Sequence, residues 1–399
     1  MKPTTPAEGV LPRPYWPHWC IHGRLYDLDP WLDRHPGGAE LLRRTRGTDC
    51  TVAFELSHLN ADRVRRILPR FEVGEAPDQA FPRYEWAGYD RLRERVRIRL
   101  EEVGWRPGPT PDGVALASSA LLLCVSTPFL WPLAGAGAFP ALTQAALAIL
   151  YVEAFITFGG FGHFYLHQNS RLAIFGDLFT LSSYEWMTTH CIEHHCYTNH
   201  PDFDNNVSVF EPLLNFAPGR SARFERFARY LLLPFYAAAF MVLRVMMPID
   251  MIRDPRQLPR RLALFVVGSL GWLVLWWAQG HLGVGLALEA AVSFVFCFLT
   301  MSNHNTAACH AALETRDFVQ FQLDATRDFG STRYWSSMLF GFFLGMQSLH
   351  HLFPMLNPRY LPIVDEELRA LGYRRHVIPF GRHCREYLRY VLGRTDGGR

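Results

Sequence analysis

Histidine is the residue type in this sequence best able to do chemistry, because it is clustered. His163 and His167 are one turn apart if their segment is helical, so both imidazoles could reach one ion. His190, His194 and His195 repeat that spacing with an extra neighbour. Any single histidine could simply lie at the surface or in the core. Three clusters that all lie just outside apolar segments, where the topology can bring them together, predict metal binding. Five more histidines also lie outside the apolar segments: His200, His304, His310, His350 and His351.

The number of imidazoles favours two metal ions over one. At least seven candidate donors exceed the needs of one tetrahedral zinc ion, and imidazole also suits copper, iron and nickel. Glu153 lies in an apolar segment ten residues before His163, where a carboxylate needs a partner. Carboxylates near the clusters could orient imidazole N–H groups, although each could also be merely solvated. These are Glu153, Glu185, Glu193, Asp202 and Asp204.

Four nearly uncharged segments are long enough to cross a bilayer and place the clusters on one side of it. They lie at residues 114–134, 139–160, 262–278 and 282–301. They pair into two hairpins whose tips lack Lys and Arg, whereas the flanking segments are basic. The positive-inside rule then places the tips outside and the long polar stretches in the cytosol. All histidine clusters are therefore expected to share the cytosolic face.

Residues 230–247 are also apolar, but they contain Arg244 and Pro234 and have arginines on both sides. We expect an interfacial helix here. The alternative, that this helix enters or spans the bilayer, remains open.

A second candidate site lies before the first apolar segment. Residues 1–78 are predicted to form a compact polar domain, with a strand pattern from Trp19 to Leu28 around a turn at His22-Gly23. His35 opens the sequence His35-Pro-Gly-Gly38, and His58 follows 23 positions later. A helical hairpin could close over a flat cofactor with one of these imidazoles on each face. A lone motif of this kind would equally be a turn with a surface histidine.

Residues 79–113 are predicted to form a charged helix and a Pro/Gly-rich linker, and residues 114–399 a membrane domain. A linker of roughly 30 residues would hold the two domains at a high effective concentration without fixing their orientation. No N-terminal signal peptide is expected.

The order of motifs in residues 15–75 resembles the cytochrome b5 haem domain. The resemblance rests on the stretch from Tyr15 to Leu28, the His35-Pro-Gly-Gly38 motif and Gly47-Thr-Asp49. It implies that His35 and His58 are the axial ligands of haem b. Such ligation leaves no open position for oxygen and implies electron transfer.

The rest of the chain resembles the membrane fatty acid desaturase superfamily, whose members carry three histidine boxes around a di-iron centre. The boxes correspond to residues 163–167, 190–195 and 347–351. The resemblance implies that these residues are the catalytic metal ligands: His163, His167, His190, His194, His195, His304, Gln347, His350 and His351. His200 and His310 have weaker claims. Gln347 and residues 317–326 look like the front-end desaturases, whereas the spacing of the second box is more like the cytochrome b5-related branch.

The resemblances imply a fold and an activity. The fold is an all-α integral membrane domain of four transmembrane helices with a cytosolic, histidine-rich helical cap, preceded by a small α+β haem domain. The activity is desaturation of an acyl chain with O2, two iron ions and electrons from the fused haem domain. The sequence has no nucleotide-binding glycine motif, so an NAD(P)H-dependent cytochrome b5 reductase would be a separate partner.

The substrate is expected to be an acyl-CoA or an acyl-lipid that enters from the bilayer. Candidate residues for an apolar tunnel are Phe155, Phe158, Phe161, Trp186, Tyr334 and Trp335, which core packing explains equally well. The membrane could be the bacterial inner membrane or the endoplasmic reticulum.

Three other functions remain open from the sequence. The same metal site could serve a fatty acid or sphingolipid hydroxylase, and a chain with an inactive catalytic half would be a membrane-anchored electron carrier. A zinc hydrolase is disfavoured by the number of histidines and by the haem partner. Nucleic-acid binding is disfavoured because the net charge is only +3 and no basic stripe carries interleaved aromatic residues. Eight scattered cysteines without a C-x-x-C motif predict no disulfide framework.

Overall fold

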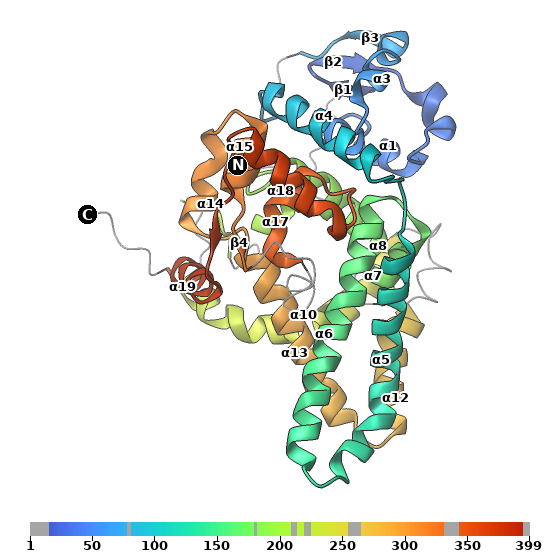
Figure 1. The fold of residues 1–399 in the computed structure, drawn as a ribbon, viewed down its shortest axis with the longest axis vertical. Helices are drawn as coiled ribbons and strands as arrows, with labels where there is room; N and C mark the ends of the chain where they lie inside the picture. The colour runs from blue at the N-terminus through green and yellow to red at the C-terminus, as the bar shows by residue number, and fades with distance from the viewer. Residues whose placement is uncertain are drawn as a thin grey trace, which may run out of the picture.

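The protein is mostly helical and has three parts. The computed structural model describes residues 16–77, 81–178, 182–208, 214–218, 225–253, 265–330 and 343–393. Figure 1 shows a small domain of strands and short helices at the top, a broad helical body in the middle and a narrow helical hairpin that extends downward. The described elements confirm the predicted small α+β domain followed by a helical part with four candidate membrane helices.

The N-terminal domain is built on a three-stranded antiparallel sheet in the order β1 (Trp19–Ile21), β2 (Arg24–Tyr26) and β3 (Glu72–Glu75). The predicted turn at His22-Gly23 joins β1 to β2, and both residues have positive φ, which glycine adopts without strain. Short helical elements connect β2 to β3: η1 (Asp29–Arg34), α1 (Ala39–Thr45), α2 (Thr51–Ser57), α3 (Ala61–Arg65) and η2 (Leu68–Phe71).

Three of the four expected spans coincide with helices that are long and apolar enough to cross a bilayer. These helices are α5 (Pro111–Gly135), α6 (Pro140–His167) and α13 (Leu282–Ser302). The α5 and α6 helices form the hairpin at the bottom of Figure 1. Because α6 continues past the expected end at residue 160, it carries His163 and His167 on the helix of the span itself.

The fourth expected span, at 262–278, is described only from residue 265 onward. There the π-helix η5 (Phe265–Leu270) leads into α12 (Gly271–Ala278), which packs against α5 and α13. Its first three residues lie outside the described part of the chain.

The fourth helix with the length and composition of a span is instead Phe227–Arg244, within α10 (Glu225–Arg253). The sequence predicted an interfacial helix here, partly because of Arg244. That reason is wrong, because Arg244 is buried and forms an ion pair with Glu289 of α13, so its charge is matched inside the protein. The direction of α10 still favours an interfacial position, since Figure 1 shows it extending sideways from the upper part of α6, roughly at a right angle to α5 and α6.

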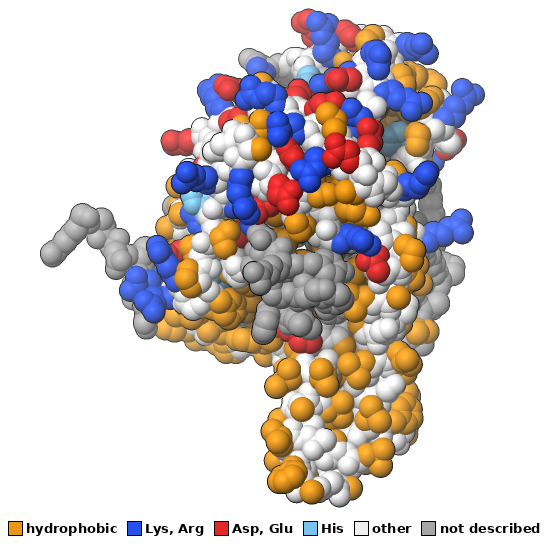
Figure 2. All heavy atoms as spheres, in the orientation of Figure 1, with side chains coloured by type: hydrophobic (Ala, Val, Ile, Leu, Met, Phe, Trp, Pro, Cys, Tyr) orange, Lys and Arg blue, Asp and Glu red, His pale blue; other side chains and the backbone are white. Residues whose placement is uncertain are grey.

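The surface of the hairpin is apolar, whereas charged side chains gather on the other parts (Figure 2). Leu133 and Phe139 near the tip are 70% and 71% exposed, and Leu122, Leu142 and Ile149 are also well exposed along it. Exposed apolar surface of this extent suits a lipid environment and not water. The chain is therefore a membrane protein, with the hairpin as its clearest embedded part.

The helical body consists of short elements that follow α6 and α13. The elements between α6 and α10 are η3 (Arg171–Ala173), α7 (Ile174–Leu178), α8 (Ser183–Trp186), η4 (Met187–His194) and α9 (Asn205–Ser208). Those after α13 are α14 (Ala307–Ala311), η6 (Ala312–Glu314), α15 (Phe318–Ala325), η7 (Leu344–Met346), α17 (Gln347–Leu352), η8 (Pro358–Tyr360), α18 (Leu361–Ala370) and α19 (Phe380–Val391). A parallel pair, β4 (Asp328–Phe329) with β5 (Val377–Ile378), joins two of these segments.

The charged helix after the N-terminal domain is α4 (Ala87–Glu102), and it is not a free linker. One side of α4 buries Leu92 and Val96, and the helix packs against α18. Its arginines form ion pairs in both directions: Arg93 with Glu55 of α2, and Arg95 and Arg99 with Glu367 of α18. The expectation of an unfixed orientation is therefore wrong. The arginine-rich sequence resembled a solvated helix, but its charges are matched by acids on both domains.

Glu55 is the buried centre of this connection. Its carboxylate contacts His22 at 2.6 Å and Arg65 at 2.8 Å, in addition to Arg93. These partners outweigh the effect of burial and lower the pKa of Glu55 to about 2.

The Glu55→Gln variant should lose about 3 kcal/mol of unfolding free energy, because two guanidinium groups would lose a buried anionic partner. The folded-state pKa of Glu55 lies below its unfolded value of 4.5. The stabilisation is thus fully present above pH 4.5 and is lost as the pH falls toward 2. Thermal unfolding followed by circular dichroism at several pH values would measure this. The control Glu72→Gln breaks an exposed pair with Arg24 and should change stability by less than about 1 kcal/mol.

Candidate metal centre and haem site

Eight histidines meet in two groups at the end of α6 that lies in the helical body, and they come from α6, η4 and its C-terminal end, α17 and the turn after α13. The smaller group is fully buried and the larger one partly buried. In each group, one ligand atom from every residue lies within 4.8 Å of the others, so each group could hold a metal ion. The five-histidine group consists of His163, His167, His190, His195 and His350. The three-histidine group consists of His194, His304 and His351.

The second histidine box lies on a π-helix, η4, and not on an α-helix. Its backbone hydrogen bonds run five residues back, as from the His195 N–H to the His190 carbonyl. His190 and His195 therefore point to the same group, whereas His194 turns to the other. The sequence interpretation, which placed His190 and His194 one α-helical turn apart, is wrong on this point. The wider turn lets one helix serve both groups.

The third box divides between the groups in the same way. His350 and His351 are neighbours on α17, and their rings lie at 90° with centres 6.0 Å apart. The position of α17 is fixed at its first turn, where Asp328 accepts a hydrogen bond from the Ser348 N–H at 2.9 Å. Arg375 contacts the Asp328 carboxylate at 2.7 Å. Sequence reasoning missed this buried anchor, because Asp328 and Arg375 are far apart in the chain.

Distances between ring nitrogens in the five-histidine group match those around a metal ion. The Nε2 atom of His163 lies 2.6 Å from that of His190 and 3.1 Å from that of His167. The Nε2 atoms of His190 and His195 are 3.0 Å apart. Bonds of about 2 Å from imidazole nitrogen to metal place neighbouring ligand atoms roughly 3 Å apart. The arrangement therefore fits a shared ion.

The imidazoles outside the spans are held in the neutral form that binds metals. Burial is the largest cause that lowers the pKa values of His190, His195 and His350 well below their usual range, and neighbouring histidines lower them further. His304 and His351 are shifted in the same direction, also chiefly by burial. Both ring nitrogens of His350 and the Nε2 of His351 are buried without a hydrogen-bond partner among the described residues. A metal ion would satisfy such atoms.

Three polar side chains orient two rings of the three-histidine group from outside. The Asp204 carboxylate accepts a hydrogen bond from His194 Nδ1 at 3.0 Å, which leaves Nε2 as the ligand atom. Thr198 Oγ1 and Gln322 Oε1 both lie 3.2 Å from His351 Nδ1. Gln322 and Thr198 were not among the predicted site residues. Gln322 lies in the segment 317–326 that supported the family resemblance, which was the only signal for it.

The other candidate carboxylates are placed differently. Asp202 is exposed, and its backbone N–H donates to His200 Nδ1 at 3.2 Å. Glu193 is fully buried within η4, and Glu153 lies half-buried in α6. Supporting roles for Glu153, Glu185 and Glu193 remain predictions.

Gln347 lies beside the three-histidine group, with Nε2 at 3.3 Å from His304 Nε2. Its role as a metal ligand remains a prediction. His310 and His200 lie in neither group. His310 is hydrogen-bonded to Asn305 Oδ1 at 3.2 Å, and His200 stacks on Phe203.

In the N-terminal domain, His35 and His58 face each other as two axial ligands would. Their ring centres are 6.1 Å apart, which leaves room for one iron between the rings. His35 Nδ1 is hydrogen-bonded to the Gly38 carbonyl at 2.9 Å and His58 Nδ1 to the Phe54 carbonyl at 2.8 Å, so both Nε2 atoms remain for the metal. A Cβ at Gly37 would lie 2.9 Å from His35 Cε1, which explains the glycine.

Of the candidate tunnel residues, Trp186 lies at the metal groups, stacked on His190 with ring centres 5.1 Å apart. Phe155, Phe158 and Phe161 belong to the main hydrophobic core. Their role in a tunnel remains a prediction. Tyr334 and Trp335 lie outside the described residues.

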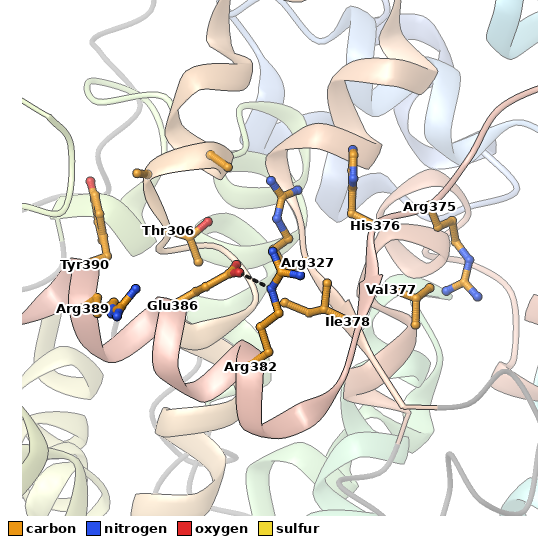
Figure 3. Close-up of a pocket in the computed structure, with 12 residues that line it drawn as sticks. Thr306, Arg327, Arg375, His376, Val377, Ile378, Arg382, Glu386, Arg389 and Tyr390 are labelled. Atoms are coloured by element: carbon orange, nitrogen blue, oxygen red, sulfur yellow. Dashed lines mark hydrogen bonds and ion pairs between the residues drawn. The ribbon is translucent and has the colours of Figure 1, made fainter. Parts of the chain in front are cut away.

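A cavity of about 640 Å³ lies between α14, β5 and α19 (Figure 3). Figure 3 shows Arg327 and Arg382 close together in its centre, and Glu386 contacts Arg382 at 2.7 Å. None of the predicted metal ligands is among its lining residues. The cavity borders Thr306, two residues after His304, but it is separate from the metal centre.

The Asp204→Asn variant should bind metal about 10- to 100-fold more weakly, because the amide cannot hold the His194 ring as the carboxylate does. Asp202→Asn is a matched control, since Asp202 is exposed two residues away. Metal content after dialysis against a graded chelator series would measure both variants. Equal retention in the two variants would rule out this role for Asp204.

The His35→Ala variant should lose the absorption spectrum of a haem with two imidazole ligands, because one axial ligand is removed. Metal held by the two histidine groups should be unchanged. His18→Ala removes another histidine of the same domain and should keep the spectrum. A normal spectrum in His35→Ala would mean that another residue is the ligand.

Comparisons with known proteins agree with the fold and the site. Residues 136–382 match the family model described as fatty acid desaturase, and residues 14–77 match that of the cytochrome b5-like heme/steroid binding domain. The cytochrome b5-related protein of Drosophila melanogaster is 30% identical over 92% of this chain and 86% of its own length. The Delta(5) fatty acid desaturase A of Dictyostelium discoideum is 24% identical over 90% and 86%, respectively.

A third relative is the chloroplastic acyl-lipid (7-3)-desaturase of Chlamydomonas reinhardtii, which is 26% identical over 93% of this chain and 78% of its own length. The resemblances found in the sequence are therefore confirmed. The fused domain implies haem, and the desaturase family implies iron. This chain belongs to the fatty acid desaturase family and carries an N-terminal cytochrome b5-like domain.

Proposed function

We propose that this protein is a membrane di-iron fatty acyl desaturase that receives electrons from its own haem domain. The observation that carries the proposal is the pair of adjacent histidine groups, with five and three imidazoles. The groups adjoin through His195 and His351, whose rings stack with centres 4.2 Å apart. With Gln347 beside the smaller group, the donor set suits two iron ions better than one zinc ion.

The reaction needs electrons as well as oxygen. Formation of one double bond consumes one O2, two electrons and two protons, and it yields two waters as two hydrogens leave adjacent carbons. When bound, haem carries single electrons, and a pair of iron ions provides the oxygen chemistry. The protein's part is to hold neutral imidazoles in place, to orient His194 through Asp204 and to keep the site buried.

The haem domain is a suitable electron source because it is docked on the same end of the molecule as the histidine groups. We infer that a separate NAD(P)H-dependent cytochrome b5 reductase reduces the haem. The haem domain, as donor, and the histidine groups, as acceptor, belong to one chain. Each electron transfer between them would therefore require no encounter between two proteins.

We propose that α5, α6, α13 and the helix containing η5 and α12 cross the bilayer, while α10 lies at its surface. Both histidine groups and the haem domain would then lie on the cytosolic side, as the basic segments flanking the spans predict. The acyl-CoA or acyl-lipid substrate would enter from the bilayer along α6, which carries His163 and His167.

The proposal is tested by expressing the wild type and two variants in host cells and analysing total fatty acids and sphingoid bases by gas chromatography–mass spectrometry. His195→Ala should abolish the product, because it removes a donor from the five-histidine group. His376→Ala is the matched control, since this exposed histidine pairs with Asp324 outside both groups. A new unsaturated species in the wild type and in His376→Ala alone is the expected result.

Two other results would redirect the proposal. A hydroxylated species with the same dependence on His195 would identify a hydroxylase. Absence of any product, together with purified protein that holds haem but no further iron, would support a membrane-anchored electron carrier.

A further inference from the structure

Two residues of the haem domain, Arg44 and Asp49, form hydrogen bonds with the membrane domain. Arg44 of α1 donates to the Tyr184 carbonyl at 2.8 Å and to Thr188 Oγ1 at 2.6 Å, and its guanidinium lies 3.9 Å from the Tyr184 ring centre. Tyr197 donates to the Asp49 carbonyl at 2.7 Å. Neither Arg44 nor Asp49 is next to an axial ligand in the sequence. We therefore assign these contacts to docking of the domain and not to electron transfer.

A third contact does involve the loop of an axial ligand. The Asn169 side-chain amide donates a hydrogen bond to the Gly37 carbonyl. The approach is close, since a Cβ at Gly38 would lie 2.4 Å from Asn169 Nδ2, and Gly38 has φ +85°. Gly38 is thus required for two reasons, backbone conformation and the space taken by Asn169.

The end of α6 presents Asn169 in this position. Asn169 has φ +49°, and its N–H bonds to the Leu166 carbonyl while the Ser170 N–H bonds to the Tyr165 carbonyl. These two bonds form a Schellman motif, in which the left-handed residue is usually Gly or Asn. Asparagine therefore meets the backbone requirement, and its side chain is free to reach the haem domain.

Of the three contacts, this one has the fewest residues between the hydrogen bond and a histidine on each side. Gly37 is two residues after His35, and Asn169 is two residues after His167 of the five-histidine group. We propose that the hydrogen bond from Asn169 to the Gly37 carbonyl is the electron-transfer contact between the haem and the metal centre. This inference rests on the proposed function, because it requires iron at both sites.

The step balances as a single-electron exchange. One ferrous haem becomes ferric, and one ferric ion of the metal centre becomes ferrous; no bond is formed or broken in the protein. The electron comes originally from NAD(P)H through the reductase, and two such steps supply one turnover. Asn169 is a positioning residue, since it acts through the hydrogen bond and touches neither metal nor substrate.

The chain allows a variant that removes the contact without disturbing the helix end. Asn169→Gly keeps the left-handed position that the Schellman motif requires, and it deletes only the amide. Asn169→Asp keeps the shape but replaces the donor with a carboxylate that repels the Gly37 carbonyl. The control Asn60→Gly removes an exposed asparagine whose side chain caps α3 within the haem domain.

The experiment uses the full-length protein loaded with haem and iron. The haem is reduced in the absence of oxygen, and its reoxidation by the ferric metal centre is followed optically after rapid photoreduction. Haem spectrum, iron content and hydrogen exchange at residues 184–188 are measured in parallel. Unchanged exchange there would show that the domain remains docked through Arg44, so a slower rate would not reflect undocking.

Asn169→Gly should slow reoxidation severalfold, because the electron loses the hydrogen-bonded route through the amide, with the spectrum and docking of the wild type. Asn169→Asp should be at least as slow, and Asn60→Gly should match the wild type. A wild-type rate in Asn169→Gly would overturn this inference and leave the proposed function intact. Loaded wild type whose haem is not reoxidised by the metal centre would overturn both.

Discussion

Eight imidazoles packed into two adjacent groups, most of them buried, are the constraint on which the rest of the structure depends. Burying polar ring nitrogens costs free energy unless each one finds a partner. On the outer side, the partners are Asp204, Thr198 and Gln322, which fix which nitrogen of His194 and His351 faces inward. On the inner side, nitrogens lie 2.6 to 3.1 Å from one another, a spacing that suits the ligands of one metal ion. The two groups are therefore suited to hold metal ions.

The helices around the groups show how that requirement shapes the backbone. A regular α-helix would present His190 and His194 on one face. In the structure they belong to different groups, because the segment η4 has π-helical hydrogen bonds. On α17, His350 belongs to the five-histidine group and its neighbour His351 to the three-histidine group. The α17 helix must therefore lie between the two groups. Asp328 and Arg375 hold it there, and their buried ion pair would be costly to break.

The second constraint is the fixed position of the haem domain. The α4 helix buries apolar residues against α18 and is ion-paired with both domains. Exposed ion pairs contribute little by themselves, so the buried side of α4 and the buried Glu55 carboxylate account for most of the attachment. The haem ligand loop at His35 is thereby kept against the end of α6. The proposed electron delivery would therefore depend on packing and not on diffusion of a tethered domain.

Much of this could be predicted from the sequence, because the signals were local. The three histidine boxes, the His35-Pro-Gly-Gly38 motif, the strand pair at residues 19–26 and the apolar segments at 114–134, 139–160 and 282–301 each depend on neighbours in the chain. The missed features depend on tertiary contacts. The π-helical turn of η4 follows from metal-site geometry, Gln322 and Asp328 act on residues distant in sequence, and the arginines of α4 find partners on two domains. Arg244 was misinterpreted for the same reason, since Glu289 is 45 residues away.

The measurement that most directly tests the two-ion centre is the ratio of iron to haem in purified full-length protein, by elemental analysis and haem absorbance. The account predicts three irons per haem: one in the haem and two in the histidine groups. One iron per haem, or zinc in place of the additional iron, would contradict it.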